Sequence, residues 1–138
     1  MRLAPFALGT LFVASLAVGQ PTDTALGRFL QAADVNDVAA MKANMTENVV
    51  AFGGKSVTAS AFLDSLSNCY LRRAYKNDIN HTILAAWMCD EGAGKSRVVI
   101  ADVRLDGQLT KVSVMREDHN DRPAPPRDGS AFGTGGKP

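Results

Sequence analysis

The sequence has few of the residues on which most metal and nucleotide sites depend. It contains two cysteines and two histidines, and these four residues do not follow the spacing of a zinc site. It also lacks a phosphate-binding glycine-rich loop, a dinucleotide-binding fingerprint and a serine nucleophile elbow. We therefore expect no metal, no nucleotide and no other cofactor.

The chain also lacks a charge excess of either sign. Its 15 lysines and arginines stand against 14 aspartates and glutamates. No run of basic residues marks a membrane-surface helix, and nucleic-acid binding needs a basic face that this balance does not supply. The composition therefore argues against a nucleic-acid partner.

A long hydrophobic run occurs only at the start, in MRLAPFALGTLFVASLAVGQ. Arg2 precedes an uncharged apolar stretch that is shorter than the roughly 20 residues needed for a membrane span. Small residues at Ala17 and Gly19 then offer a cleavage site before Gln20. This pattern is typical of a secretory signal peptide, and the alternative is a membrane anchor. We expect removal of residues 1–19 and a secreted or periplasmic protein with no membrane segment.

Large apolar residues are scarce near the C-terminal end of the sequence. From Glu117 onward the chain holds four of the six prolines and four of the twelve glycines, with Phe132 as its one large apolar residue apart from alanines. Such a composition cannot bury enough surface to offset chain entropy. We predict a disordered Pro/Gly-rich tail over residues 118–138, which leaves residues 20–117 as one small domain.

The periodicity of this domain changes from helical to extended near Cys69. Apolar residues spaced three and four apart predict helices around Leu26–Ala33 and in residues 34–45 and 58–68. A short strand interrupted by Gly53-Gly54 lies between the second and third helices. Four β-rich segments separated by turn compositions then predict an antiparallel meander; they are residues 70–76, 81–90, 95–105 and 108–117.

The two cysteines, Cys69 and Cys89, flank the first predicted hairpin. Residues paired across an antiparallel hairpin have numbers with a constant sum, and a turn centred near Ile79 pairs these two cysteines. An oxidising compartment permits a disulfide, so we predict this cross-link. The alternatives are two buried free cysteines, a redox pair or an intermolecular bond.

The Asp106-Gly107 turn predicts a second hairpin. The same rule gives an apolar core face that contains Val99, Ala101 and Val103, and it places Asp102 on the other face, opposite Lys111. We interpret Asp102 and Lys111 as an exposed cross-strand ion pair. The alternative is that Asp102 lies in a cavity as a general base.

The order of these elements resembles the NTF2-like (SnoaL-like, cystatin-like cone) superfamily. The residues that carry the resemblance are FLQAADVNDVAAMKANMTENVVAFGG and SVTASAFLDSL, within a region of about residues 24–117. It implies an α+β fold in which three N-terminal helices pack on a curved, mainly antiparallel sheet and enclose a conical pocket. Members of this superfamily include isomerases, lyases, non-catalytic ligand binders and dimeric interaction modules.

No catalytic set of the superfamily maps onto this sequence residue by residue. The catalytic candidates are Asp102, His81 and Tyr75, and the ligand-binding candidates are Tyr70, Arg72, Arg73 and Trp87. Arg72 and Arg73 should point to opposite faces of their strand, and the inward one would bind an anionic group. We therefore expect a small apolar or anionic ligand.

Three functions remain open from the sequence. We expect a non-catalytic small-molecule-binding domain, because the composition supplies a mostly apolar pocket with a few polar groups. The first alternative is a ketosteroid-isomerase-like isomerase or lyase, with Asp102 or His81 as base and a tyrosine as oxyanion donor. The second is an interaction module that forms a homodimer through the outer sheet face, which contains Val98, Ile100, Leu109 and Met115.

Overall fold

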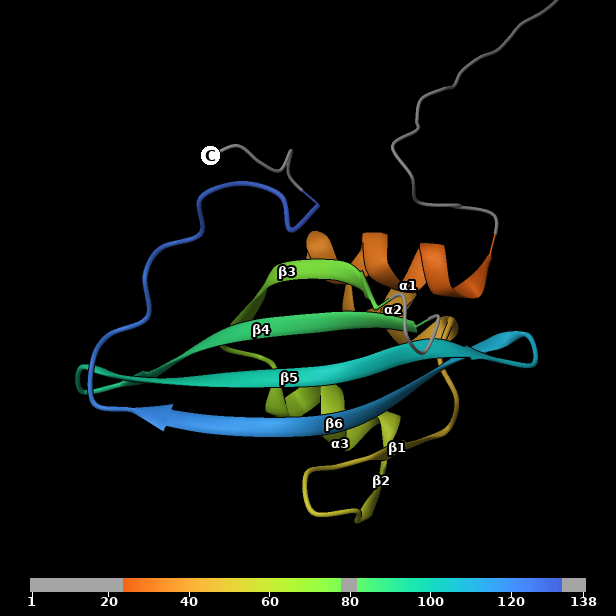
Figure 1. Ribbon diagram of the computed structural model, residues 1–138, viewed down its shortest axis with the longest axis horizontal. Coiled ribbons are helices and arrows are strands. Elements are labelled where there is room, and N and C mark those ends of the chain that lie inside the picture. The colour runs from red at the N-terminus through yellow and green to blue at the C-terminus, as the bar shows by residue number, and fades with distance from the viewer. Residues whose placement is uncertain (1–23, 78–81, 133–138) are drawn as a thin grey trace, which may run out of the picture.

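The computed structural model describes residues 24–77 and 82–132. Within these residues two helices are followed by two short strands, a third helix and four longer strands (Figure 1). Their bounds are α1 Ala25–Asp34, α2 Val38–Ala43, β1 Asn48–Val50, β2 Ser56–Thr58, α3 Ala59–Ser65, β3 Cys69–Asn77, β4 Thr82–Gly92, β5 Lys95–Asp106 and β6 Leu109–Asn120.

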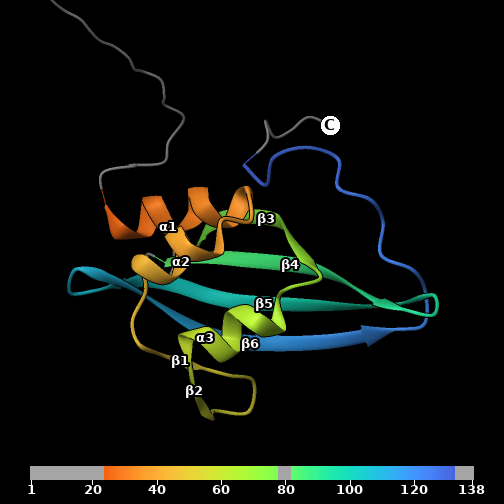
Figure 2. The ribbon, with the colours of Figure 1, turned by 180° about the vertical axis from the view of Figure 1, so that it is seen from behind.

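The strands form one mixed sheet in the order β2-β1-β6-β5-β4-β3. All neighbouring strands are antiparallel except β1 and β6, which run parallel with Val50 beside Ser113. The helices lie over one face of the sheet (Figure 2). This confirms the α+β class, but the helices do not form one N-terminal block, because β1 and β2 lie between α2 and α3.

Each helix begins at a side chain that accepts a hydrogen bond from its first turn. Thr24 accepts from the Gly27 amide at 3.0 Å, Asp37 from Ala40 at 3.1 Å, and Thr58 from Ala61 at 3.1 Å. Such caps satisfy amides that have no partner within the helix.

The core lies between the helices and the sheet face that they cover. Its fully buried side chains include Phe29 and Leu30 of α1 and Leu71, Val99, Val103 and Val112 of the sheet. The predicted core face of β5 is therefore confirmed, although its pairing with β6 differs. Gly107 and Gln108 form the turn, so Val103 lies opposite Val112 and not Thr110. A shift of two residues leaves the side chains between the turn and the bulge at Met115 on their predicted faces.

The predicted disulfide between Cys69 and Cys89 is present, with their Cα atoms 3.9 Å apart. Both residues are buried and lie directly opposite each other on β3 and β4. In the chain-entropy model, closing a loop of about 20 residues stabilises the fold by roughly 3 kcal/mol. The bond therefore fixes the β3–β4 register at the end of β3 that follows α3.

Three register shifts interrupt the sheet. The unpaired residues are Arg72 in β3, Glu91 in β4 and Met115 in β6. Each extra residue is a β-bulge, and beyond it the alternation of side chains between the two faces restarts out of phase.

The bulge at Arg72 changes two of the pairings that the constant-sum rule predicts for this hairpin. Arg73 lies opposite Ala86 and Tyr75 opposite Leu84, where a turn centred at Ile79 would pair them with Ala85 and Ile83. Tyr75 is therefore on the outer sheet face, with 54% of its surface exposed. It is not a core residue.

The predicted tail is largely ordered in the part of the chain described. Residues 118–120 belong to β6, and the following segment passes round that end of the sheet to reach β3 and α1 (Figure 1). Tyr70 donates a hydrogen bond to the Pro125 carbonyl at 2.6 Å. Ala131 is buried, and Phe132 packs against the core. Composition alone therefore misjudged residues 118–132.

The Asp34 carboxylate, at the end of α1, holds this segment. It accepts hydrogen bonds from Arg127 at 2.6 Å, from the Ser130 hydroxyl at 2.7 Å and from the Ala131 amide at 2.8 Å. Arg127 also donates to the Asp34 carbonyl. Charge-assisted hydrogen bonds are stronger than neutral ones, so the Asp34 side chain holds residues 127–131 against the end of α1.

We predict that Asp34→Ala releases the tail. The variant leaves three donors without their acceptor, so trypsin should cleave after Arg127 at least about tenfold faster than in the wild type. Mass spectrometry of a limited digest measures the rate. Asp64→Ala, an exposed change on α3, is the control; equal rates in all three proteins would contradict the role of Asp34.

Candidate functional site

A cavity of about 220 Å³ lies between α3, the β1–β2 segment and the inner face of β5 and β6. Figure 2 shows α3 in front of these strands. Most of the lining is apolar, and the polar groups are Ser65, Arg97 and Glu117; the apolar residues are Ala51, Phe52, Val57, Ala61, Phe62, Val99 and Val114. We call this space the cone cavity.

Arg97 is the centre of the polar end of the cone cavity. It is 9% exposed and projects from the inner face of β5. Its guanidinium donates to the Ser65 carbonyl at 2.7 Å, to Glu117 at 3.0 Å and to Glu91 at 3.3 Å. Nη2 also donates toward Cys69 Sγ, with 3.9 Å between the nitrogen and the sulfur. A buried charge is tolerated only when it is paired in this way.

Both carboxylates reach Arg97 because of bulges. Glu91 is itself the extra residue of the β4 bulge. Glu117 follows the bulge at Met115, which places it opposite Val99 on the inner face. Strict alternation from Val112 would have placed Arg116 there instead. The bulges therefore determine that the cone cavity contains a carboxylate beside its arginine.

Phe62, in the lining of the cone cavity, packs against Trp87 in the core behind it. Phe62 of α3 meets Trp87 of β4 edge to face, with ring centroids 6.0 Å apart and planes at 85°. This arrangement matches the preferred geometry of aromatic pairs. Ser65 Oγ donates to the Phe62 carbonyl at 2.6 Å, which fixes the last turn of α3 beside Arg97.

Sequence reasoning missed both Arg97 and Glu117. The buried position of Arg97 could have been predicted from the sequence, because Arg97 alternates in phase with Val99, Ala101 and Val103, which were predicted to form the core face. A charged residue in phase with a core face is a signal for a buried ion pair. The position of Glu117 could not have been predicted, since the sheet face on which it lies depends on the bulge at Met115.

Asp102 does not lie in the cone cavity. It sits on the outer sheet face between Leu84 and Ser113, and Lys111 lies opposite Arg104. The predicted Asp102–Lys111 pair is therefore wrong, because the turn is centred one residue later than assumed. Asp102 Oδ1 is buried without a hydrogen-bond partner among the described residues.

The other candidates also lie outside this cavity. Tyr75 and Arg73 are exposed on the outer face, and Arg72 is the bulge residue of β3. Tyr70 faces outward beneath the C-terminal segment, and Trp87 is core behind Phe62. His81 lies outside the described residues.

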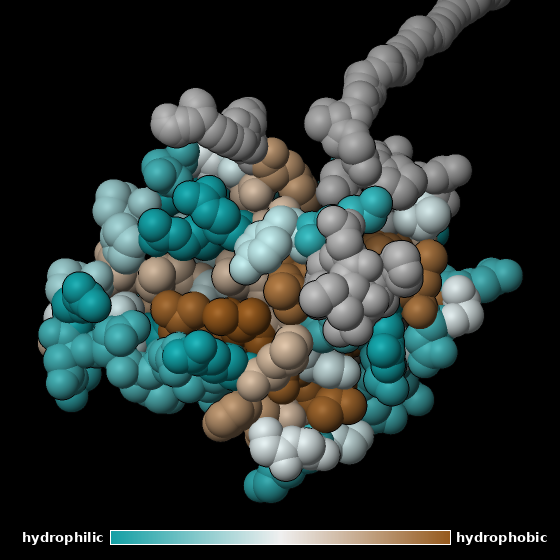
Figure 3. Space-filling view, in the orientation of Figure 1, coloured by the Kyte–Doolittle hydropathy of each residue, from teal (hydrophilic) through white to brown (hydrophobic). Residues whose placement is uncertain are grey.

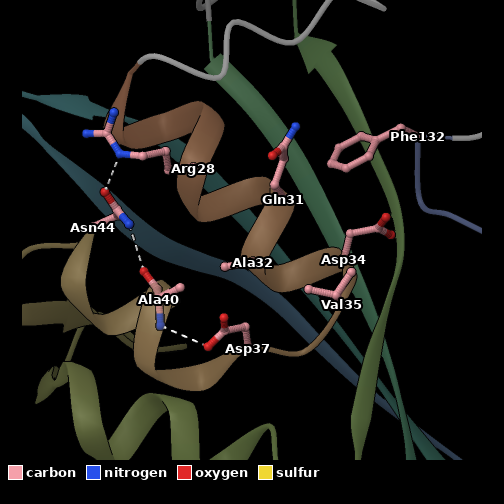
Figure 4. Close-up of a pocket in the computed structure, with 9 residues that line it drawn as sticks. All are labelled: Arg28, Gln31, Ala32, Asp34, Val35, Asp37, Ala40, Asn44 and Phe132. Carbon is pink, nitrogen blue, oxygen red and sulfur yellow. Dashed lines mark hydrogen bonds between the residues drawn. The ribbon is translucent and has the colours of Figure 1, made fainter. Parts of the chain in front are cut away.

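A second, more open hollow lies between α1 and α2 (Figure 4). It has a volume of about 490 Å³, and Phe132 borders one end. Four of the five polar side chains in its lining already serve the fold: Asp37 caps α2, Asn44 donates to the Ala40 carbonyl at 2.8 Å, and Arg28 donates to Asn44 at 2.9 Å. Asp34 holds the tail. We therefore regard the cone cavity as the better candidate site.

Over residues 24–77 and 82–132, no group of three or more histidine, cysteine, aspartate or glutamate side chains could hold a metal ion. No helix within these ranges is long and apolar enough to cross a membrane. The disulfide is compatible with an oxidising compartment.

Comparison with known proteins gives one structural similarity. The sequence matches no family model and no curated protein. The fold is similar to the crystal structure of an uncharacterized cystatin-fold protein from Novosphingobium aromaticivorans, with 16% sequence identity. The match covers 67% of this chain and 98% of the other, with a TM-score of 0.47. At this level the neighbour carries no information on function.

The Arg97 hydrogen bond holds the pKa of Glu91 below its ordinary value of 4.5, although burial opposes the shift. Because the pKa of Glu91 is lower in the folded state than in the unfolded state, its ionised form stabilises the fold at a pH above the unfolded-state pKa. This stabilisation is lost as the pH falls through the folded-state pKa. We predict that Arg97→Lys raises the Glu91 pKa toward 4.5. Carbon-detected NMR titration of Glu91 measures it; identical pKa values in the two proteins would contradict this cause.

Proposed function

We propose that the protein is a non-catalytic binder of a small, mainly apolar molecule in the cone cavity. The observation that carries the proposal is the lining: apolar and aromatic walls from α3, the β1–β2 segment, β5 and β6, with the polar groups gathered at one end. Ligand pockets combine apolar walls with a few polar groups that orient the ligand. The volume equals that of roughly seven liquid water molecules, which suits a ligand with a single ring.

Binding without chemistry fits the lining better than an isomerase or lyase does. Those reactions need a general base together with an oxyanion donor. The described residues that line the cone cavity include neither a histidine nor a tyrosine, and Asp102 and Tyr75 lie on the opposite sheet face. Its one carboxylate, Glu117, is engaged by Arg97.

Filling the cone cavity should abolish binding. We predict that n-propylbenzene shifts the amide NMR signals of Val99 and Val114 in the wild type. Ala61→Phe, on the cavity side of α3, should remove these shifts, since the new ring occupies the ligand volume. Ala39→Phe, an exposed change on α2, should bind like the wild type. Unchanged binding in Ala61→Phe, or no binding by the wild type, would overturn the proposal.

The element order and the inner cavity support membership of the NTF2-like cone superfamily, as the sequence resemblance implies. The disulfide supports export to a secreted or periplasmic location. The predicted signal peptide, residues 1–19, lies outside the described residues. If the intact mass of the exported protein does not correspond to a chain that starts near Gln20, this result would argue against the cleavage.

The outer sheet face supports a second function, formation of a homodimer. An apolar strip runs along this face (Figure 3); its residues are Leu84, Ala86, Met88, Val98 and Ile100, with Met115 57% exposed beside them. Exposed apolar patches often mark interfaces, and a two-fold axis would allow the strip to pack against its own copy.

A charge in the strip should prevent dimerisation. We predict that light scattering gives a dimer for the wild type and a monomer for Ile100→Glu, because an unpaired buried carboxylate is costly. Val38→Glu, on exposed α2, should remain dimeric. A monomeric wild type at high concentration would exclude this function.

A further inference from the structure

The hydrogen bonds of Arg97 bear directly on which ligand the cone cavity accepts. A ligand carboxylate binds arginine best through two adjacent N–H groups. Here Nε serves Glu91, Nη1 serves Glu117, and Nη2 serves the Ser65 carbonyl and lies 3.9 Å from Cys69 Sγ. Four of the five N–H groups thus already have an acceptor in the protein. A ligand carboxylate could bind through two adjacent N–H groups only by displacing one of these acceptors.

The polar group that remains available to a ligand is an acceptor. Glu117 lines the cone cavity, its side chain is 32% exposed, and Oε2 is the atom engaged by Arg97. An ionised carboxylate only accepts hydrogen bonds and has about four acceptor positions. Glu117 can therefore take a further donor from a ligand while it keeps its bond to Arg97.

The charge and the walls favour a donor that is positively charged. Two carboxylates, Glu91 and Glu117, share one guanidinium, so this cluster carries a net charge of minus one when both are ionised. Phe52 and Phe62 contribute aromatic rings to the same cavity. Aromatic faces attract cations, most strongly where water is excluded.

We propose that the cone cavity selects a small aromatic ammonium compound. Its ring fills the apolar part of the cavity, and its ammonium group donates to Glu117. This inference rests on the proposed binding function and names the class of ligand. Arg97 acts as a positioning residue, because it orients Glu117 and does not itself bind the ligand.

Three probes of similar size test the inference by calorimetry at pH 7: 2-phenylethylamine, n-propylbenzene and phenylacetate. They differ mainly in the charge of the side-chain end. We expect the amine to bind about tenfold tighter than n-propylbenzene, as a charge-assisted hydrogen bond allows, and phenylacetate to bind weakest. Added salt should weaken only the binding of the amine appreciably.

Glu117→Gln isolates the carboxylate, because its amide oxygen can still accept from Arg97. We expect the amine to lose its advantage in this variant and n-propylbenzene to bind as before. Glu47→Gln makes the same change in charge at an exposed position on another surface, and it should leave the preference intact. If Glu117→Gln does not fold, the salt dependence in the wild type provides the same test.

The outcomes separate the two proposals. Binding of n-propylbenzene without tighter binding of the amine would overturn the ammonium inference and leave the binding function standing. Tightest binding of phenylacetate would also overturn it. Failure of all three probes to bind would overturn the binding function, and the inference with it.

Discussion

The structure around the cone cavity depends on the neutralisation of one buried cation. Arg97 lies on β5, and its partners come from α3, β4 and β6, with the disulfide of β3 and β4 beside it. A guanidinium in this position destabilises the fold unless all these groups converge on it. The Arg97 side chain therefore links three features of the fold: the position of α3, the bulge in β4 and the placement of Glu117 on the inner sheet face.

This linkage also explains the polarity of the cavity. A free arginine would make the site a receptor for anions, but here the guanidinium serves the protein and leaves a carboxylate toward the open space. The aromatic pair of Phe62 and Trp87 holds α3 against the sheet on the other side. The cavity thus has apolar walls and one oriented acceptor, and apart from Ala51 and Phe52 in the β1–β2 turn its lining residues come from helices and strands.

Much of the sheet could be predicted because apolar and polar residues alternate regularly along its strands. The inner face of β5 and the cysteine pair follow from alternation and residue number alone. The bulges could not be predicted, since a single unpaired residue such as Met115 leaves no mark on composition. The C-terminal segment escaped prediction for another reason: its order depends on Asp34, which lies about ninety residues earlier in the chain.

The bulge at Met115 has a consequence for how this strand can vary between relatives. Loss of one residue at this point would restore a regular ladder and still leave Glu117 opposite Val99. Loss of one residue at this position would therefore keep Glu117 on the inner face. At a position without a bulge, the same loss would turn the following side chains to the opposite face. Alignments of this strand therefore need to permit a one-residue gap before the cavity glutamate is compared.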